Sequence, residues 1–223
     1  MIEVLEPIQH AYQMEVITIE SFQGNAYFTH YETENGEPKN PKVIDPMELI
    51  SRLRQQSQLQ VIDSRIVYSD SDLLVWHFTP PAGTPLYLKS NGQSLALKIK
   101  WPNLLFARKG KALFVAVLQH KTRPTNKTRL YLAPLPNVYA NHNICLGSVS
   151  LPDNNDIDEI SMAYIESTKT HLSNSDFWRK GGLTIERYVQ WIKQKADSKT
   201  PISVSELKYS GTVSEFIQKL GGK

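Results

Sequence analysis

Cys145 is the only cysteine of the 223 residues, and it lies in the segment Asn143-Ile-Cys-Leu-Gly147. A single cysteine cannot form an internal disulfide, a Cys-x-x-Cys redox pair or a thiolate zinc cage. Two interpretations remain. The side chain is either a small buried hydrophobe between Ile144 and Leu146, as free cysteines often are, or a nucleophile that reacts as its thiolate. These residues alone favour the buried interpretation.

A reactive cysteine needs partner groups, and three side chains are candidates. Asn137 precedes Cys145 by eight residues across a proline-rich loop, and its amide could donate to an oxyanion. A turn residue after Pro136 is an equally good account of this asparagine. His142 and His171 could each act as a base, although a histidine in a loop or at a helix end is usually solvated or caps the helix.

Several other chemistries are excluded by missing motifs. The six histidines, at positions 10, 30, 77, 120, 142 and 171, show no grouping with metal-ligand spacing. The sequence has no Gly-Lys-Ser/Thr phosphate loop and no Gly-x-Gly-x-x-Gly motif, so we expect no cofactor. The apolar runs are too short to span a membrane and the N-terminal residues are unlike a signal peptide. We therefore expect a soluble, cytoplasmic protein.

Charge is segregated along the chain, although the net charge is only +3. Residues 73–152 carry ten Lys and Arg and no Asp or Glu, and Cys145 lies in this stretch. If these cations converge in space, they favour a thiolate. The same stretch could form a nucleic-acid surface or dock an acidic protein. Its aromatic residues occupy strand positions that need burial, which argues against the nucleic-acid surface.

The apolar pattern predicts an α+β fold, in which helices follow an antiparallel meander and pack on one side of it. A hairpin in the first 33 residues, a polar loop at 32–42 and a helix from Asp45-Pro46 to about Gln56 come first. The predicted strands are 72–79, 86–89, 95–99, 104–107, 113–118 and 129–133, and the predicted helices are 157–171, 183–195 and 213–220. This order divides the chain into an N-terminal extension, 1–60, and a main domain, 61–223.

The segment Tyr131-Leu-Ala-Pro-Leu-Pro-Asn-Val-Tyr139, followed by Asn143-Ile-Cys-Leu-Gly147, resembles the active-site segment of ubiquitin-conjugating enzymes. That family has a His-Pro-Asn motif with the asparagine eight residues before the cysteine. The bacterial PRTRC system protein B group, a prokaryotic branch of the same fold, is more similar still, from about residue 73 onwards. The residues that carry this likeness are Arg123-Pro-Thr125, Tyr131, Ala133-Pro-Leu135, Asn137-Val-Tyr139, Cys145-Leu-Gly-Ser148 and Ser167-x-x-Thr-His171.

The sequence also departs from the family pattern. Leu135 replaces the motif histidine, and Asn141-His142 replaces the usual turn of the Asp-Gly type. Asp153 stands where many eukaryotic members have a tryptophan. Residues 1–60 have no counterpart in the minimal fold.

The resemblance implies a transthiolation enzyme that works with a ubiquitin-like protein, a ThiF-type activating enzyme and a JAB-type metalloprotease. Cys145 would carry the thioester, Asn137 would stabilise the oxyanion or the loop, and His171 would be a supporting group or a base. Three alternatives stay open. They are an inactive member of the fold that only binds partners, a cysteine hydrolase that uses Cys145 and His171, and a basic nucleic-acid-binding module.

Overall fold

The computed structural model describes residues 16–23, 25–34, 37–49, 62–90 and 92–221. The chain divides into two compact units, residues 1–61 and residues 62–223. The second unit contains the whole of the acid-free stretch and all of the candidate site residues.

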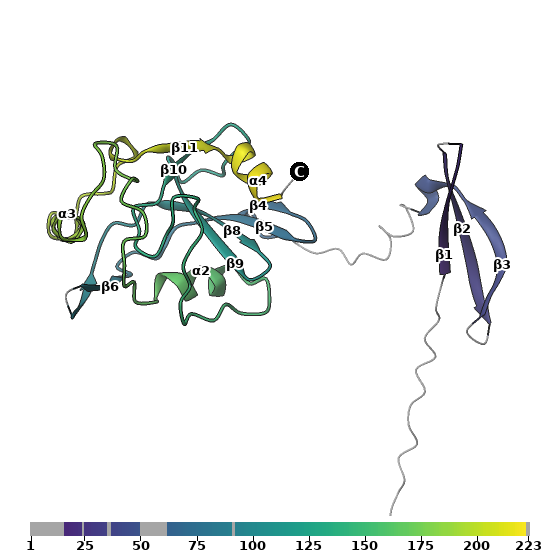
Figure 1. Cartoon of the computed structure of the whole chain (residues 1–223), viewed down its shortest axis with the longest axis horizontal. Helices are drawn as coiled ribbons and strands as arrows, with labels where there is room; N and C mark the ends of the chain where they lie inside the picture. Colours follow the sequence, from purple (N-terminus) through teal and green to yellow (C-terminus); the bar gives the residue numbers. More distant parts are fainter. Residues whose placement is uncertain (1–15, 24, 35–36, 50–61, 91, 222–223) are drawn as a thin grey trace, which may run out of the picture. The chain divides into compact units, whose positions relative to one another are not determined.

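The first unit is a three-stranded antiparallel sheet of β1 (Val16–Phe22), β2 (Asn25–Glu34) and β3 (Glu37–Ile44), with β2 in the middle (Figure 1). The predicted hairpin corresponds to β1 and β2. The polar segment 32–42 was expected to be a loop, and this is wrong, because most of it belongs to the paired strands β2 and β3. Pro38 and Pro41 are compatible with β3 because it is an edge strand with a register shift, where a missing amide donor is tolerated.

A helix begins at Pro46 as the sequence predicted. The carboxylate of Asp45 accepts hydrogen bonds from the main-chain amides of Met47 and Glu48, at 2.7 and 3.4 Å. This is N-capping, in which a side chain satisfies amides that have no partner inside the helix. The helix is described as far as residue 49, and the remainder of the predicted helix lies outside the described residues.

A six-stranded antiparallel sheet forms the centre of the second unit, in the order β11-β10-β9-β8-β5-β4 (Figure 1). Its strands are β4 (Ile66–Ser69), β5 (Leu73–Phe78), β8 (Asn103–Lys109), β9 (Ala112–Leu118), β10 (Arg129–Leu132) and β11 (Tyr209–Thr212). Four of them lie where the sequence predicts strands. The edge strands β4 and β11 are four residues each, and β11, with the sequence Tyr-Ser-Gly-Thr, has little apolar pattern, which is why it was not predicted.

The hairpin of β6 (Leu86–Ser90) and β7 (Gln93–Leu97) lies outside this sheet. The sequence predicted its two strands as members of the meander, and only their pairing with each other is observed. The physical reason lies in the prolines on either side, Pro80-Pro81 and Pro102, which have no amide donor to continue a ladder. Strand β5 therefore pairs directly with β8.

The central strands bury side chains on both faces of the sheet. In β5, Trp76 packs into a core cluster with the helices α2 (Ile157–Ile165) and α3 (Ile185–Asp197), whereas Val75 packs into a second cluster under α4 (Val213–Gly221). This double burial explains why these strands are almost continuous apolar runs. The α+β class is confirmed. The expectation that all helices pack on one side is wrong, because the strands bury apolar side chains on both faces and α4 covers the face opposite α2 and α3.

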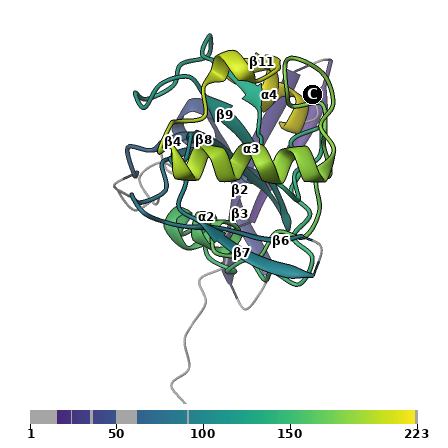
Figure 2. The same ribbon diagram turned by 90° about the vertical axis from the view of Figure 1, so that its left-hand side faces the viewer.

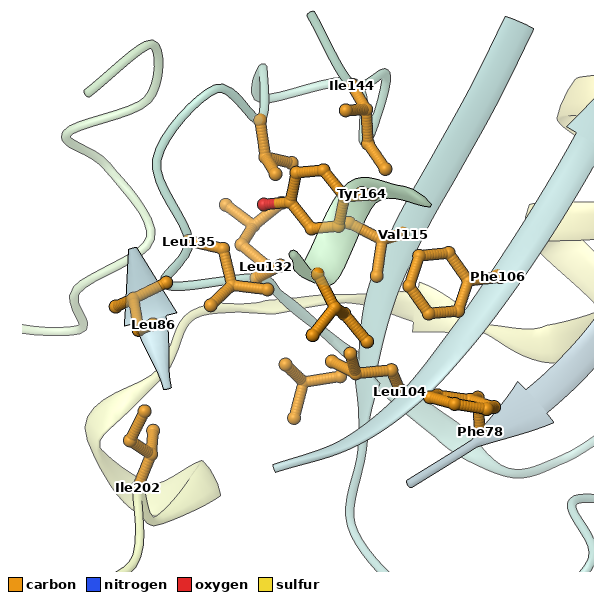
Figure 3. Close-up of a cluster of buried hydrophobic side chains, with 14 of the residues drawn as sticks. Phe78, Leu86, Leu104, Phe106, Val115, Leu132, Leu135, Ile144, Tyr164 and Ile202 are labelled. Carbon is orange, nitrogen blue, oxygen red and sulfur yellow. The ribbon is translucent and has the colours of Figure 1, made fainter. Parts of the chain in front are cut away.

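The larger core cluster fixes α2 and α3 against one face of the sheet, and Figure 2 shows α3 lying across it. The indole of Trp76 donates to the hydroxyl of Ser161 on α2, at 2.9 Å. Figure 3 shows Tyr164 of α2 and Phe106 of β8 on the same cluster, with ring centroids 6.3 Å apart and nearly perpendicular planes. These contacts place α2 beside the chain that leaves β10, where the cysteine is found.

Candidate functional site

Residues 133–147, which follow β10, form the cysteine loop. Its first half is buried, and two phenols of the large core hold its main chain. The hydroxyl of Tyr164 on α2 donates to the carbonyl of Pro136 at 2.9 Å, and that of Tyr188 on α3 donates to the carbonyl of Pro134 at 3.1 Å. Burial raises the pKa of both tyrosines, so their protons stay available for these bonds. The helices therefore fix the start of the loop.

The second half of the cysteine loop folds back on the first. The amide of Tyr139 donates to the carbonyl of Asn143 at 2.8 Å, and the amide of Cys145 donates to the carbonyl of Asn137 at 2.7 Å. A tight turn, in which the amide of His142 donates to the carbonyl of Tyr139 at 2.9 Å, joins the two segments. The structure thus brings Asn137 and Cys145 side by side across a short antiparallel ladder.

Main-chain bonds dock this ladder on the start of β9. The amide of Ile144 donates to the carbonyl of Leu113 at 2.8 Å, and the amide of Val115 donates to the carbonyl of His142 at 2.9 Å. Ile144 is 4% exposed. Cys145, the next residue, is only partly buried, so the loop keeps Ile144 in the core and leaves Cys145 partly exposed.

Asn137 braces the loop with its side chain as well as its main chain. It is 8% exposed and has a φ of 62°, a left-handed conformation that asparagine tolerates better than most residues. Its Oδ1 accepts from the amides of Thr170 and His171, at 3.0 and 3.2 Å, and its Nδ2 donates to the carbonyl of Cys145 at 3.4 Å. The side chain therefore bridges the cysteine and the segment after α2.

His171 contributes to this arrangement through its main chain. Its carbonyl accepts from the amide of Asn137 at 2.8 Å, in addition to the bond that its amide makes to Oδ1. The imidazole is exposed, and its Nδ1 lies 3.0 Å from the hydroxyl of Thr170. Within the described residues, the hydrogen bonds of this ring do not reach the thiol.

His142, the other histidine considered as a base, faces the opposite direction. It is 8% exposed, its Nδ1 lies 3.2 Å from the carbonyl of Val115, and its ring meets Phe216 of α4 edge to face at 5.3 Å. Burial lowers the pKa of His142, which favours the neutral imidazole. These contacts make it a packing residue between the turn and α4.

Tyr139 is a residue at this site for which the sequence indicated no role. The neighbouring side chain of Cys145 raises the pKa of Tyr139. The phenol is 43% exposed, so the two groups lie at the surface. The fold-back of the loop places Tyr139 beside the cysteine, and the spacing of six residues by itself gives no sign of this.

Lys169 is a second residue that sequence reasoning missed. The side chain is fully buried, and its Nζ donates to the carbonyls of Tyr164, Ile165 and Ser167 at 2.6 to 2.7 Å. Burial lowers the pKa of Lys169 to about 7. Its position four residues after the end of α2 is the available signal, because lysines often cap the last carbonyls of a helix.

Lys169 also explains why α2 ends at Ile165 and not near residue 171 as predicted. The lysine turns back on the last carbonyls of the helix, while its main chain pairs with β6. Its amide donates to the carbonyl of Tyr87 at 3.0 Å, and its carbonyl accepts from the amide of Lys89 at 2.8 Å. This extended segment carries Thr170 and His171 to Asn137.

Four cations of the acid-free stretch make their side-chain contacts outside the cysteine loop. Arg108 donates to the carbonyl of Asn154, Lys109 to the carbonyl of Leu220, and Arg123 to two carbonyls near β4. Arg129 lies over the ring of Tyr209. Within the described residues, none of these side chains hydrogen-bonds to the cysteine loop.

Comparisons with known proteins give one finding that covers this site. The family model described as prokaryotic E2 family D matches residues 42–196, from β3 to the end of α3. This range includes the cysteine loop, α2 and the segment that carries Thr170 and His171. No curated protein and no solved structure matches the chain. In the part of the chain that the structure describes, no helix combines the length and the apolar character needed to cross a membrane.

Proposed function

The chain belongs to prokaryotic E2 family D, and on this basis we propose that it is a conjugating transferase that carries a ubiquitin-like protein as a thioester on Cys145. The family predicted from the sequence is confirmed, and membership links the chain to ubiquitin-like conjugation. The thioester, the transfer to an amine and the roles of individual residues are the content of the proposal.

One observation carries the proposal furthest, namely the partial exposure of Cys145 beside buried, hydrogen-bonded residues of the cysteine loop. The ladder partner Asn137 and the neighbour Ile144 are buried, whereas Cys145 is partly exposed and lies beside the exposed Tyr139. A cysteine that served only as core packing would lie with its neighbours in the interior. A fixed, accessible thiol is what a thioester carrier needs.

The proposed reaction has two balanced steps. In the first, the thiolate of Cys145 attacks the carbonyl carbon of a thioester on a ThiF-type activating enzyme, and the thiolate of that enzyme leaves. In the second, an amine attacks the carbonyl carbon of the new thioester, the C–S bond breaks, and Cys145 leaves as thiolate while the amine loses a proton to solvent or a base. The proposed reaction needs no cofactor on this chain, because the activating enzyme uses ATP to adenylate the ubiquitin-like protein.

We assign Asn137 a positioning role on the basis of its contacts. Its Oδ1 accepts two hydrogen bonds and one N–H of its Nδ2 donates to the carbonyl of Cys145, so these groups hold the loop. The second N–H of Nδ2 is available to an oxyanion, which is the other role proposed for this residue. His171 anchors Asn137 through its main chain, and its exposed imidazole is the candidate base for the incoming amine.

The geometry gives less support to a cysteine hydrolase. Such an enzyme needs an imidazole in contact with the thiol. Here the ring of His171 is bonded to Thr170, and the side chain of Tyr139 lies near that of Cys145. A hydrolase would release its substrate to water, whereas the proposed transferase holds it until an amine arrives.

The proposal is tested by incubating the chain with the ubiquitin-like protein, its activating enzyme and ATP, followed by non-reducing gels. We expect an adduct that thiols cleave in the wild type and that is absent in Cys145→Ala. Because Cys145 is the only cysteine, such an adduct needs no further mapping. The variant Cys145→Ser is a matched control that should give a thiol-resistant oxyester.

The absence of any adduct in the wild type, with an activating enzyme shown to charge itself, would refute the carrier role and leave a member of the fold that only binds partners. If the adduct forms but decays equally fast with and without added amine, the chain is a hydrolase. A normal discharge rate in His171→Ala would remove the imidazole as a base while retaining its main-chain role.

A further inference from the structure

A cleft of about 750 Å³ opens beside the sheet, in a region that the proposed thioester chemistry does not use. Loops that follow β5, β7 and β9 form three of its walls, and the segment between α3 and β11 forms the fourth. The volume is in the range of ligand-binding clefts in proteins. The floor is apolar, and the side chains that form it include Ile99, Trp101, Val117, Leu118 and Ile202.

Four lysines stand around this apolar floor: Lys98, Lys100, Lys121 and Lys199. Each is exposed, and the residues that line the cleft include no Asp or Glu. Among the described residues, none of the four ammonium groups makes an ion pair or a side-chain hydrogen bond. Their charges are therefore not neutralised locally, and the cleft combines apolar surface with a positive rim.

The cleft lies well away from the cysteine. Its wall includes Val117 at the end of β9, whereas Cys145 follows Ile144, which is bonded to Leu113 at the start of the same strand. Four residues of extended strand separate the two sites by about 13 Å. Figure 3 likewise shows Ile202 and Ile144 at opposite ends of the core cluster. A molecule in the cleft would leave the thiol free.

We infer that this cleft docks a segment of a partner protein in which apolar side chains are flanked by carboxylates. The apolar floor accounts for the first feature and the rim for the second, through charge complementarity. The lysines come from three separate chain segments around the rim, with Lys98 and Lys100 in one of them. A small anion with one carboxylate would meet one or two of them, whereas an acidic polypeptide segment can meet all four.

The test uses the full-length chain and a fluorescein-labelled peptide with Leu-Phe at its centre and alternating Glu and Asp on both sides. Fluorescence anisotropy should show binding that weakens as salt rises, because exposed ion pairs are screened. A matched peptide with Gln and Asn in place of the acids should bind at least about tenfold more weakly than the acidic peptide. Laurate serves as the small-molecule probe and is tested as a competitor.

Two variants locate the binding site. The double variant Lys98→Glu, Lys199→Glu reverses half of the rim and should weaken binding of the acidic peptide about tenfold or more. Lys111→Glu is the matched control, because Lys111 is an exposed lysine at the turn between β8 and β9 and does not line the cleft. It should bind the peptide within about twofold of the wild type. Circular dichroism and urea unfolding establish that both variants fold.

The inference is overturned if the acidic peptide fails to bind, if the acidic and neutral peptides bind equally, or if the double variant binds like Lys111→Glu. Binding of laurate without binding of the peptide would assign the cleft to a small apolar anion and also overturns the inference. None of these outcomes depends on Cys145, so the inference and the proposed transferase activity are tested separately.

Discussion

Replacing Asn137 by aspartate and by alanine separates the two roles that this residue can have in the cysteine loop. Aspartate retains an oxygen in the place of Oδ1, which accepts from the amides of Thr170 and His171, and it tolerates a φ of 62°. It lacks the N–H groups that an oxyanion would need. Alanine loses both the acceptor and the donors.

The magnitude for alanine follows from these contacts. Thr170 and His171 are exposed, so water can reach their amides, and we take the lower end of the penalty for an unsatisfied donor, about 1 kcal/mol each. A left-handed conformation adds about 1 kcal/mol for an alanine. The free energy of unfolding should therefore fall by about 3 kcal/mol in Asn137→Ala. In Asn137→Asp a carboxylate oxygen faces the carbonyl of Cys145, and we expect a loss of about 1 kcal/mol.

Urea unfolding measures the stability, and single-turnover discharge of the Cys145 thioester to free lysine measures the chemistry. If Asn137 positions the loop, Asn137→Asp should discharge within about threefold of the wild type, and Asn137→Ala should be about tenfold slower as the loop loosens. The rate of alkylation of Cys145 by iodoacetamide reports the loop without any partner protein. It should change in Asn137→Ala more than in Asn137→Asp.

The positioning argument is refuted if Asn137→Asp is nearly as stable as the wild type and yet discharges as slowly as Asn137→Ala. A loss of about a hundredfold in both variants would match the removal of an oxyanion donor, and the amide N–H would then be the functional group. Normal discharge in both variants would reject either role.

Three further predictions concern neighbouring residues. Tyr139→Phe removes the hydroxyl near the side chain of Cys145, so iodoacetamide should alkylate Cys145 more slowly near neutral pH without a change in stability; an equal or faster rate contradicts this. For Lys169, whose pKa is lowered from 10.5 to about 7 in the folded chain, the unfolded chain binds the extra proton above pH 7, so stability should rise between about pH 7 and 10. Urea midpoints across that range, compared with those of Lys169→Met, should show a slope that only the lysine confers. Tyr188→Phe removes the donor to the buried carbonyl of Pro134 and should lower the free energy of unfolding by about 1–2 kcal/mol; a neutral effect in urea would mean that the phenol does not hold the loop.

The parts of the fold that the sequence predicted are those determined by local pattern. The strands 104–107 and 113–118 are apolar runs separated by a turn, and they became β8 and β9. Asp45-Pro46 has the residues of a helix start, and it is one. The parts that were missed depend on contacts between distant residues. Segment 37–44 forms a strand because it pairs with β2. Its own sequence contains two prolines and has no pattern that indicates a strand.

The candidate site divides in the same way. The sequence indicated Asn137 and Cys145 as a pair through their spacing of eight residues, and the structure brings the two residues together. The sequence did not indicate which groups lie beside the thiol of Cys145 or bind the side-chain amide of Asn137. Tyr139 lies near the thiol because the loop folds back. Thr170 reaches Asn137 because the buried Lys169 ends α2 early and its own main chain pairs with β6. Both depend on tertiary contacts that a spacing does not encode.

Leu135 replaces the histidine of the family motif, and the structure shows how the loop is held without an imidazole. Its side chain is 1% exposed in the large core cluster, so the position contributes packing rather than hydrogen bonds. The main chain on either side is bound by phenols, at Pro134 and at Pro136. These two bonds and the side chain of Asn137 supply polar support from α2, α3 and the segment after α2. The substitution therefore does not by itself argue for an inactive protein, because the loop that presents Cys145 is supported from three directions.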